Sequence, residues 1–163
     1  MMENSHNETV NENSILTETP LGDNDKHLKI QLCVEFFKKE VKSSRTSKNT
    51  LKTSNRQEKK QLNVTISKLK NVPKLQGKNP NPFVKVRLLP DDIIHTTELQ
   101  QGKSDAQYFE TFVFPTENLS EKVLRVEVCD KKVTRSAKTF GKVDISLDTL
   151  NLSKPMLKWF ELA

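Results

Sequence analysis

Residues 77–91 read GKNPNPFVKVRLLPD, and this stretch decides the fold. Its first half is rich in turn-forming residues, and Pro80 and Pro82 favour a tight loop over a regular element. In its second half, apolar residues alternate with Lys85 and Arg87. The apolar residues of this alternation are Val84, Val86 and Leu88. A period of two predicts a strand with one buried face, so the stretch is an exposed loop that leads into a half-buried strand.

The same alternation recurs along the chain. Strands are predicted at 27–37, 61–69, 93–100, 107–114, 122–128, 141–147 and 157–162, with the segment 93–100 the weakest pattern. Glu110 shares the parity of the inward aromatic residues of its strand, which predicts a bulge or a partnered carboxylate. Helical patterns of 10–15 residues do not alternate with these strands. We therefore predict an all-β fold, an eight-stranded antiparallel β-sandwich.

Charge is distributed unevenly over the 163 residues. Residues 1–25 carry six acidic and no basic residues and have few apolar side chains, which predicts a disordered acidic tail. Residues 26–163 are expected to form a single domain with 27 basic and 15 acidic residues, a net charge of +12. Within it, residues 38–60 hold nine basic and two acidic residues without an apolar period, which predicts a long basic loop.

The strongly basic domain favours anionic partners, namely an anionic membrane surface or an acidic protein. Cys33 and Cys129 lie far apart in sequence and lack the spacing of a zinc site, so they are expected to be reduced cysteines. A secretory signal pattern is missing at the N-terminus, and apolar runs fall short of a transmembrane segment. The expected location is therefore the cytoplasm, with peripheral association with membranes.

From Leu28 onwards the order of strands and loops resembles a C2 domain of the synaptotagmin type. The stretch 77–91 is similar to the family's Gly-x-Ser-Asp-Pro-Tyr-Val-Lys-Val-x-Leu-Leu-Pro-Asp signature, and YFETFVFP at 108–115 is similar to Phe-Asn-Glu-x-Phe-x-Phe. LRVEVCD at 124–130, FGKVDISLDTL at 140–150 and KWFEL at 158–162 resemble the last three strands, with Gly141 at the family's glycine. The resemblance implies a C2-like sandwich.

Calcium-binding members of this family use five acidic positions on two loops. In this sequence those positions fall on Leu75, Asn81, Asp130, Lys132 and Lys138. Ca²⁺ needs six to eight oxygen ligands and clustered carboxylates, and here only Asp130 is retained. The resemblance therefore predicts a degenerate calcium site, with no metal and no cofactor, in which Asp130 pairs with a neighbouring lysine.

The same loops carry basic side chains that could bind anionic lipid. The candidate lipid-binding residues are Lys74, Lys78, Lys131, Lys132, Arg135 and Lys138 on the loops, and Lys85 and Arg87 on the strand that follows the first loop. Many relatives bind phosphoinositides through a lysine-rich strand face, and the next strand here offers only His95. Solvated surface lysines without a ligand remain the alternative for Lys85 and Arg87.

Catalysis is not expected, because the three histidines have no triad-like neighbours and the four glycines form no phosphate loop. The preferred function is a calcium-independent C2 module that acts as a peripheral-membrane or protein-interaction adaptor. The resemblance implies a context in membrane trafficking. The alternatives are a purely protein-binding C2 scaffold and, less favoured because aromatic stacking platforms are scarce, a nonspecific nucleic-acid-binding protein.

Overall fold

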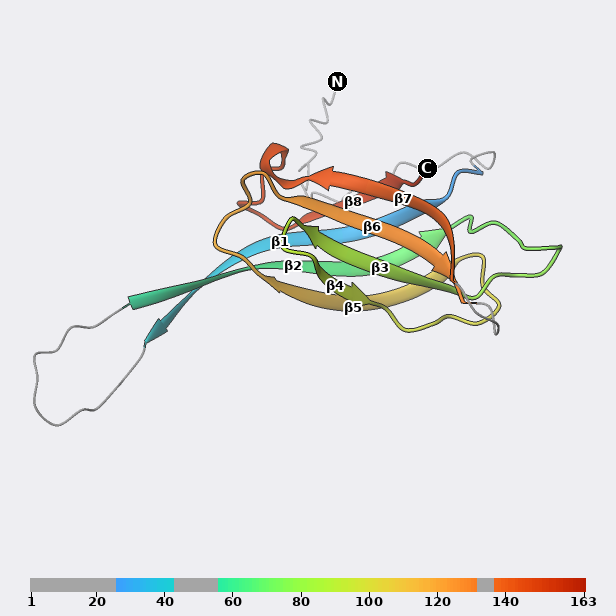
Figure 1. Ribbon diagram of the computed structural model, residues 1–163, viewed down its shortest axis with the longest axis horizontal. Coiled ribbons are helices and arrows are strands. Elements are labelled where there is room, and N and C mark those ends of the chain that lie inside the picture. Colours follow the sequence, from blue (N-terminus) through green and yellow to red (C-terminus); the bar gives the residue numbers. More distant parts are fainter. Residues whose placement is uncertain (1–25, 43–55, 132–136) are drawn as a thin grey trace, which may run out of the picture.

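The computed structural model describes residues 26–42, 56–131 and 137–163 (Figure 1). The described residues form eight strands and one short 3-10 helix. These elements are β1 (Lys29–Lys42), β2 (Arg56–Lys70), β3 (Pro82–Leu89), β4 (Ile93–Thr96), β5 (Ala106–Pro115), β6 (Val123–Asp130), β7 (Lys138–Ser146), η1 (Leu147–Thr149) and β8 (Met156–Glu161). The all-β prediction is confirmed. The predicted acidic tail, residues 1–25, lies outside the described residues.

The strands form two four-stranded sheets that pack face to face. One sheet has the order β5-β2-β1-β8 and the other has the order β4-β3-β6-β7. Every pairing between neighbouring strands is antiparallel. The predicted antiparallel sandwich is therefore confirmed. Among the described residues, no helix has the length and hydrophobicity needed to cross a membrane.

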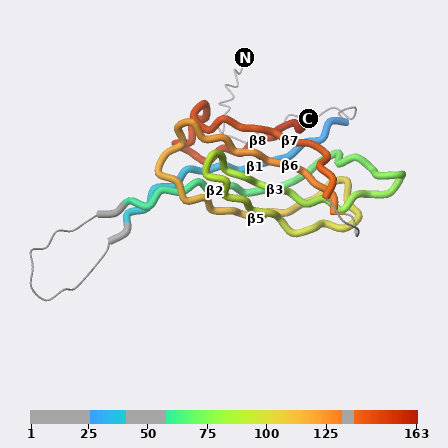
Figure 2. The backbone as a smooth tube through the Cα atoms, in the orientation of Figure 1, coloured from blue at the N-terminus to red at the C-terminus, as the bar shows by residue number. Residues whose placement is uncertain are grey.

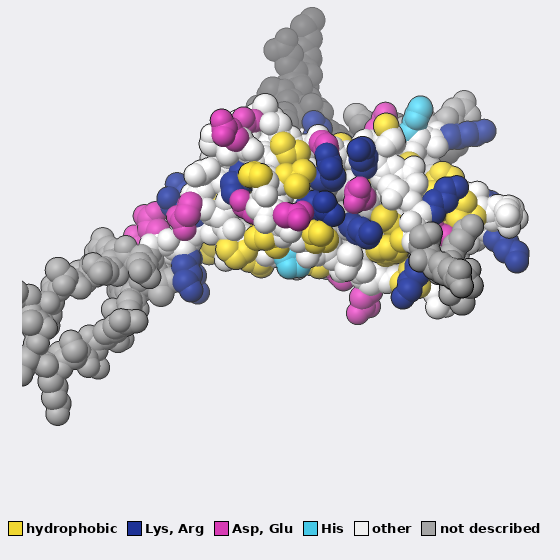
Figure 3. All heavy atoms as spheres, in the orientation of Figure 1, with side chains coloured by type: hydrophobic (Ala, Val, Ile, Leu, Met, Phe, Trp, Pro, Cys, Tyr) yellow, Lys and Arg dark blue, Asp and Glu magenta, His cyan; other side chains and the backbone are white. Residues whose placement is uncertain are grey.

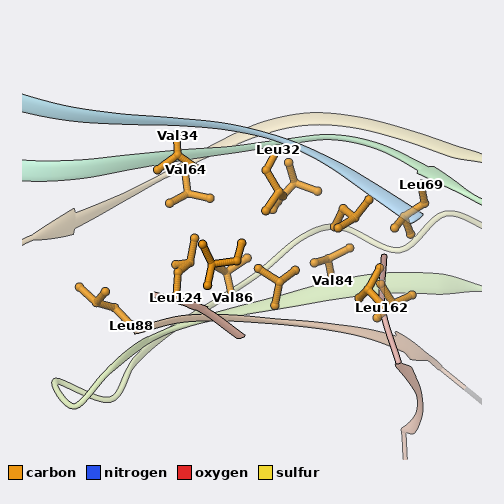
Figure 4. Packing of buried hydrophobic residues seen from close by; sticks show 14 of the residues in the cluster. Leu32, Val34, Val64, Leu69, Val84, Val86, Leu88, Leu124 and Leu162 are labelled. Atoms are coloured by element: carbon orange, nitrogen blue, oxygen red, sulfur yellow. The ribbon is translucent and has the colours of Figure 1, made fainter. Parts of the chain in front are cut away.

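The core lies between the sheets and is built from the apolar residues that alternate along each strand. Leu32, Val34 and Val64 from β1 and β2 are fully buried against Val86 and Leu124 from β3 and β6 (Figure 4). Each strand buries one face because alternate side chains point to opposite sides of a sheet. This shared core holds the connecting loops at the two ends of the sandwich.

The prediction of a basic loop over residues 38–60 is wrong at both ends. β1 continues to Lys42 and β2 begins at Arg56, so residues 38–42 and 56–60 form a two-stranded ribbon, which we call the arm (Figure 2). Residues 43–55 lie outside the described residues. β8 pairs with β1 only as far as Val34, and β5 pairs with β2 only from Gln61 onwards. The arm therefore projects beyond the sandwich with no strand on either side.

A β-bulge interrupts the pairing of β2 with β5, as the parity of Glu110 indicated. Ile66 pairs with Glu110 and Lys68 with Gln107, so β5 contains one extra residue. Phe109 occupies the bulge with a φ of 51° and is 61% exposed. Both Glu110 carboxylate oxygens accept a hydrogen bond from the Glu98 backbone N–H, at 3.2 and 3.1 Å. Both parts of the sequence prediction, the bulge and the partnered carboxylate, are confirmed.

Candidate functional site

Three loops meet at the end of the sandwich opposite the arm, and we call this region the loop end (Figure 1). It comprises residues 71–81 between β2 and β3, residues 97–105 between β4 and β5, and residues 131–137 between β6 and β7. Of these, residues 132–136 lie outside the described residues. The predicted site residues Lys132 and Arg135 are therefore not placed.

The first loop is shaped by a tight turn at its tip. Leu75 and Lys78 exchange two backbone hydrogen bonds with N···O distances of 2.9 and 3.0 Å. Gln76 and Gly77 between them have φ values of 51° and 75°, the positive values that a two-residue hairpin turn requires. Lys74 and Lys78 flank this turn and are exposed. Leu75, at one of the family's acidic positions, supplies an apolar side chain that cannot ligate a cation.

The base of the loop end is tied together by hydrogen bonds at two further family positions, Asn81 and Asp130. Asp130 is 3% exposed, and its Oδ1 accepts the Asn81 backbone N–H at 2.7 Å. The Asn81 carbonyl oxygen accepts the Lys131 N–H at 3.2 Å, and its Oδ1 accepts the Gly102 N–H at 2.8 Å. The first, second and third loops are thus joined through Asn81.

Within the described residues, the Asp130 carboxylate is held by the Asn81 backbone N–H. Its pairing with a neighbouring lysine stays a prediction, because Lys132 lies outside the described residues. A backbone N–H pointing at a carboxylate gives a charge-assisted hydrogen bond. Lys138 pairs with Asp130 in the β6–β7 register and is exposed. In the parts of the chain that the structure describes, no three His, Cys, Asp or Glu side chains gather closely enough to hold a metal ion.

Basic side chains dominate the described surface of the loop end. Lys74, Lys78 and Lys131 are exposed there, and Lys138 is exposed at the adjoining start of β7; all four are predicted site residues. The structure adds exposed Lys103 on the second loop, whose backbone N–H bonds to the Pro80 carbonyl oxygen at 2.9 Å. Figure 3 shows Lys and Arg side chains spread around this end. Sequence reasoning missed Lys103 because only the fold brings the second loop beside the first.

Lys85 and Arg87 lie on the outer face of the β4-β3-β6-β7 sheet, where acidic residues offset their positive charge. Arg87 Nε lies 3.5 Å from Asp92 Oδ1. The Lys85 ammonium lies 5.9 Å from the centre of the Phe83 ring, and its cross-strand partner is Glu127. These two predicted site residues are therefore separate from the loop end, on a surface of mixed sign.

The same sheet face contains a two-pronged ion pair between β6 and β7. Arg125 Nε and Nη2 each lie 2.7 Å from an oxygen of Asp144. The hydrogen bonds from Arg125 lower the pKa of the Asp144 carboxyl below its usual range. This guanidinium is therefore engaged within the sheet, which leaves less free positive charge on the face that holds Lys85 and Arg87.

His95 does not contribute to a phosphoinositide-binding strand face, which is the role considered for it from the sequence. Its ring stacks on Phe112 with centroids 5.2 Å apart and meets Phe114 edge-on at 4.9 Å. Phe114 is fully buried in the core. His95 therefore points between the sheets, and β4 presents no basic side chain on the outer face beside Lys85.

Comparison with known proteins places these observations in a family. The C2 domain family model matches residues 60–162, more than half of the chain. The chain is 29% identical over 109 residues to the phosphatidylinositol 4-phosphate 3-kinase C2 domain-containing subunit alpha of Pongo abelii, a match that covers 62% of this chain and 6% of that protein. The chain thus spans a small fraction of the length of this relative.

Solved structures agree on the fold. A C2 domain of RIM from Drosophila superposes with a TM-score of 0.68 at 21% identity, covering 85% of this chain and 100% of that chain. The third C2 domain of the KIAA1228 protein gives a TM-score of 0.64 at 19% identity, covering 88% and 93% of the two chains. With the family match, the sheet order and the three meeting loops, the chain belongs to the C2 domain family.

Proposed function

We propose that this C2 domain is a calcium-independent binding module that attaches to anionic phospholipid surfaces through the lysines of its loop end. The observation that carries the proposal is the charge of the described loops. Lys74, Lys78, Lys103 and Lys131 are exposed there, and Lys138 is exposed at the adjoining start of β7. The one acidic side chain retained from the family's five positions, Asp130, is occupied by a backbone hydrogen bond. A metal is thus not needed to make this end positive.

Electrostatics gives the expected strength. Each lysine near an anionic leaflet contributes about 1 kcal/mol, and the contribution falls with salt. The described loop lysines together would hold the domain reversibly at a membrane. This supports a peripheral, cytoplasmic adaptor without catalytic activity of its own. A role in membrane trafficking, suggested by the resemblance to synaptotagmin-type domains, belongs to the same proposal.

The test is co-sedimentation with phosphatidylcholine vesicles that contain or lack phosphatidylserine. Binding should require phosphatidylserine, should be the same in Ca²⁺ and in a chelator, and should weaken as salt rises above ~0.15 M. The variant K74Q/K78Q should lower the affinity about thirtyfold, as expected from losing two charges that contribute about 1 kcal/mol each. The control K142Q/K158Q removes the same charge from the bodies of β7 and β8 and should bind as the parent does.

Two results would count against this function. Binding that appears only with Ca²⁺, or saturable heat in a calorimetric Ca²⁺ titration, would contradict calcium independence. An absence of vesicle binding even at low salt would favour the alternative, a protein-binding C2 scaffold. One observation supports that alternative: Val113, Leu157 and Phe109 are exposed on the outer face of the β5-β2-β1-β8 sheet.

A further inference from the structure

The arm has an unusual charge register. Four of its five cross-strand pairs place like charges opposite each other. These pairs are Lys38 with Lys60, Lys39 with Lys59, Glu40 with Glu58 and Lys42 with Arg56. Like charges directly opposite destabilise a sheet, and an isolated two-stranded ribbon is marginal in water. The arm holds six basic and two acidic residues, so its excess positive charge is not neutralised within the ribbon.

One face of the arm carries two of the six basic residues and neither of the two acidic ones. Lys60 Nζ lies 3.7 Å from Glu58 Oε2, and both belong to the parity that faces the core at Phe36 and Leu62 further along. Lys39 and Lys59 belong to the opposite parity and are exposed. Alternation places them on the outer face of the β5-β2-β1-β8 sheet. The Lys39–Lys59 pair is therefore the part of the arm most available to an external anion.

Apolar side chains adjoin this lysine pair. Phe37, two residues before Lys39 on the same face, is 43% exposed. In the register, Phe37 pairs with Gln61 and Gln61 pairs with Pro115, which is exposed at the end of β5. Figure 3 shows acidic and basic side chains together where the arm leaves the sandwich. Lysines with an exposed aromatic beside them suit the boundary between headgroups and acyl chains.

The arm and the loop end lie at opposite ends of the molecule (Figure 1). β2 joins them, and its 15 residues at about 3.3 Å each span roughly 50 Å. This distance is several times the Debye length of about 8 Å at physiological ionic strength, so the two basic regions act independently. We infer that the arm is a second site for an anionic phospholipid surface, so that one copy of the domain bridges two such surfaces.

A bilayer fits the arm better than an acidic peptide does. Neither outer edge of the described arm is paired with another strand, and charged side chains on such edges disfavour the addition of a peptide strand. Its lysine pair and Phe37 lie on one face and match a broad surface that is charged outside and apolar within. The bridging part of the inference rests on the proposed function, because the loop end must bind the other surface.

The first experiment tests the arm alone. F37W places a tryptophan on the arm face, and the chain carrying only Trp159 supplies the background emission. In the K74Q/K78Q background, vesicles with phosphatidylserine should shift the added emission to the blue, and vesicles of phosphatidylcholine alone should not. Adding K39Q/K59Q should abolish the shift, whereas adding K142Q/K158Q should leave it. An unshifted emission, or binding of soluble polyglutamate in place of vesicles, would overturn the arm site.

The second experiment tests bridging, with light scattering and co-sedimentation measured on the same samples. The parent chain should cluster vesicles that contain phosphatidylserine. K39Q/K59Q should still co-sediment through the loop end but should cluster vesicles at least several-fold less, and K142Q/K158Q should match the parent. K39Q/K59Q removes a like-charged pair, so unfolding of the arm does not explain a loss. Equal clustering by K39Q/K59Q and the parent would overturn bridging.

The two experiments separate the two proposals. Failure of the loop end appears as vesicle binding that K74Q/K78Q leaves unchanged. Failure of the arm appears as an unshifted F37W emission, whatever the loop end does. A chain that binds vesicles through its loops, fails to cluster them and shows no F37W shift retains the proposed function and loses the further inference.

Discussion

Asp130 stands at one of the family's acidic positions, and here its carboxylate accepts a backbone hydrogen bond. Its carboxylate is nearly buried and accepts the Asn81 N–H at 2.7 Å. Asp130→Asn should weaken this charge-assisted bond and lower the free energy of unfolding by about 1–3 kcal/mol, measured by urea denaturation. Asp105→Asn is a matched control, since its Oδ1 accepts the Asn71 N–H at 2.9 Å at an exposed position. Equal losses in the two variants would contradict the importance of burial at Asp130.

Asp144 predicts how stability depends on pH. Hydrogen bonds from Arg125 lower the pKa of this carboxyl from its ordinary value of 3.8. A lowered pKa in the folded state stabilises the protein above the unfolded-state pKa, and the stabilisation disappears as the pH falls through the folded-state pKa. Asp144→Asn should therefore have a lower Tm than the parent at neutral pH, and the two should converge in strong acid. A Tm gap that persists undiminished below pH ~3 would exclude this linkage.

Among the elements, β5 contains a local strain that a substitution can release. Phe109 has a φ of 51°, a left-handed conformation that is unfavourable for a bulky side chain and free for glycine. Val113 is exposed on the same strand and is not among the positive-φ residues. Phe109→Gly should be more stable than Val113→Gly by about 1–2 kcal/mol in thermal unfolding. Equal destabilisation by the two glycines would show that the bulge is not strained.

Strand faces were predictable from the sequence because burial of one face leaves a period of two. Leu62, Val64 and Ile66 alternate in the sequence and are fully buried in the structure. The same reasoning missed the arm, since its sequence has no alternation of apolar and polar residues and it extends a ladder that begins inside the sandwich. It also misassigned His95, whose ring packs on Phe112 between the sheets. The His95 ring points inward because of the residues that it packs against on β5, and the sequence of the short strand β4 does not show this orientation.

The candidate site was predictable in its residues and less so in its arrangement. The resemblance identified Asn81 and Asp130 as loop positions, and the structure joins them by a hydrogen bond. The signature could not show that Lys85 and Arg87 lie on a charge-balanced sheet face, because Asp92 and Glu127 approach them only through the fold. The sequence shows which charged side chains a strand carries. It does not show which opposite charges the fold brings beside them from neighbouring strands.

For the whole molecule, stability should be graded along the β1–β2 pair. Residues 30–34 of β1 pair with β2 on one side and β8 on the other, whereas the arm is paired on one side only. Opening of the arm exposes little apolar surface and relieves repulsion between like charges. Its amides should therefore exchange with solvent at least about a hundredfold faster than those of residues 30–34. Hydrogen exchange followed by mass spectrometry measures this difference.

Salt and one substitution distinguish charge repulsion from simple fraying. The Debye length falls from about 10 Å at 0.1 M salt to about 3 Å at 1 M, so added salt should slow exchange in the arm and leave residues 30–34 unchanged. Lys39→Glu converts the Lys39–Lys59 pair into an attractive one and should slow arm exchange at low salt. Lys142→Glu is the control away from the arm and should not. If neither salt nor Lys39→Glu changes the exchange rates of the arm amides, repulsion between like charges does not limit the stability of the arm. Neutralisation of the arm by an anionic surface would then not stabilise it.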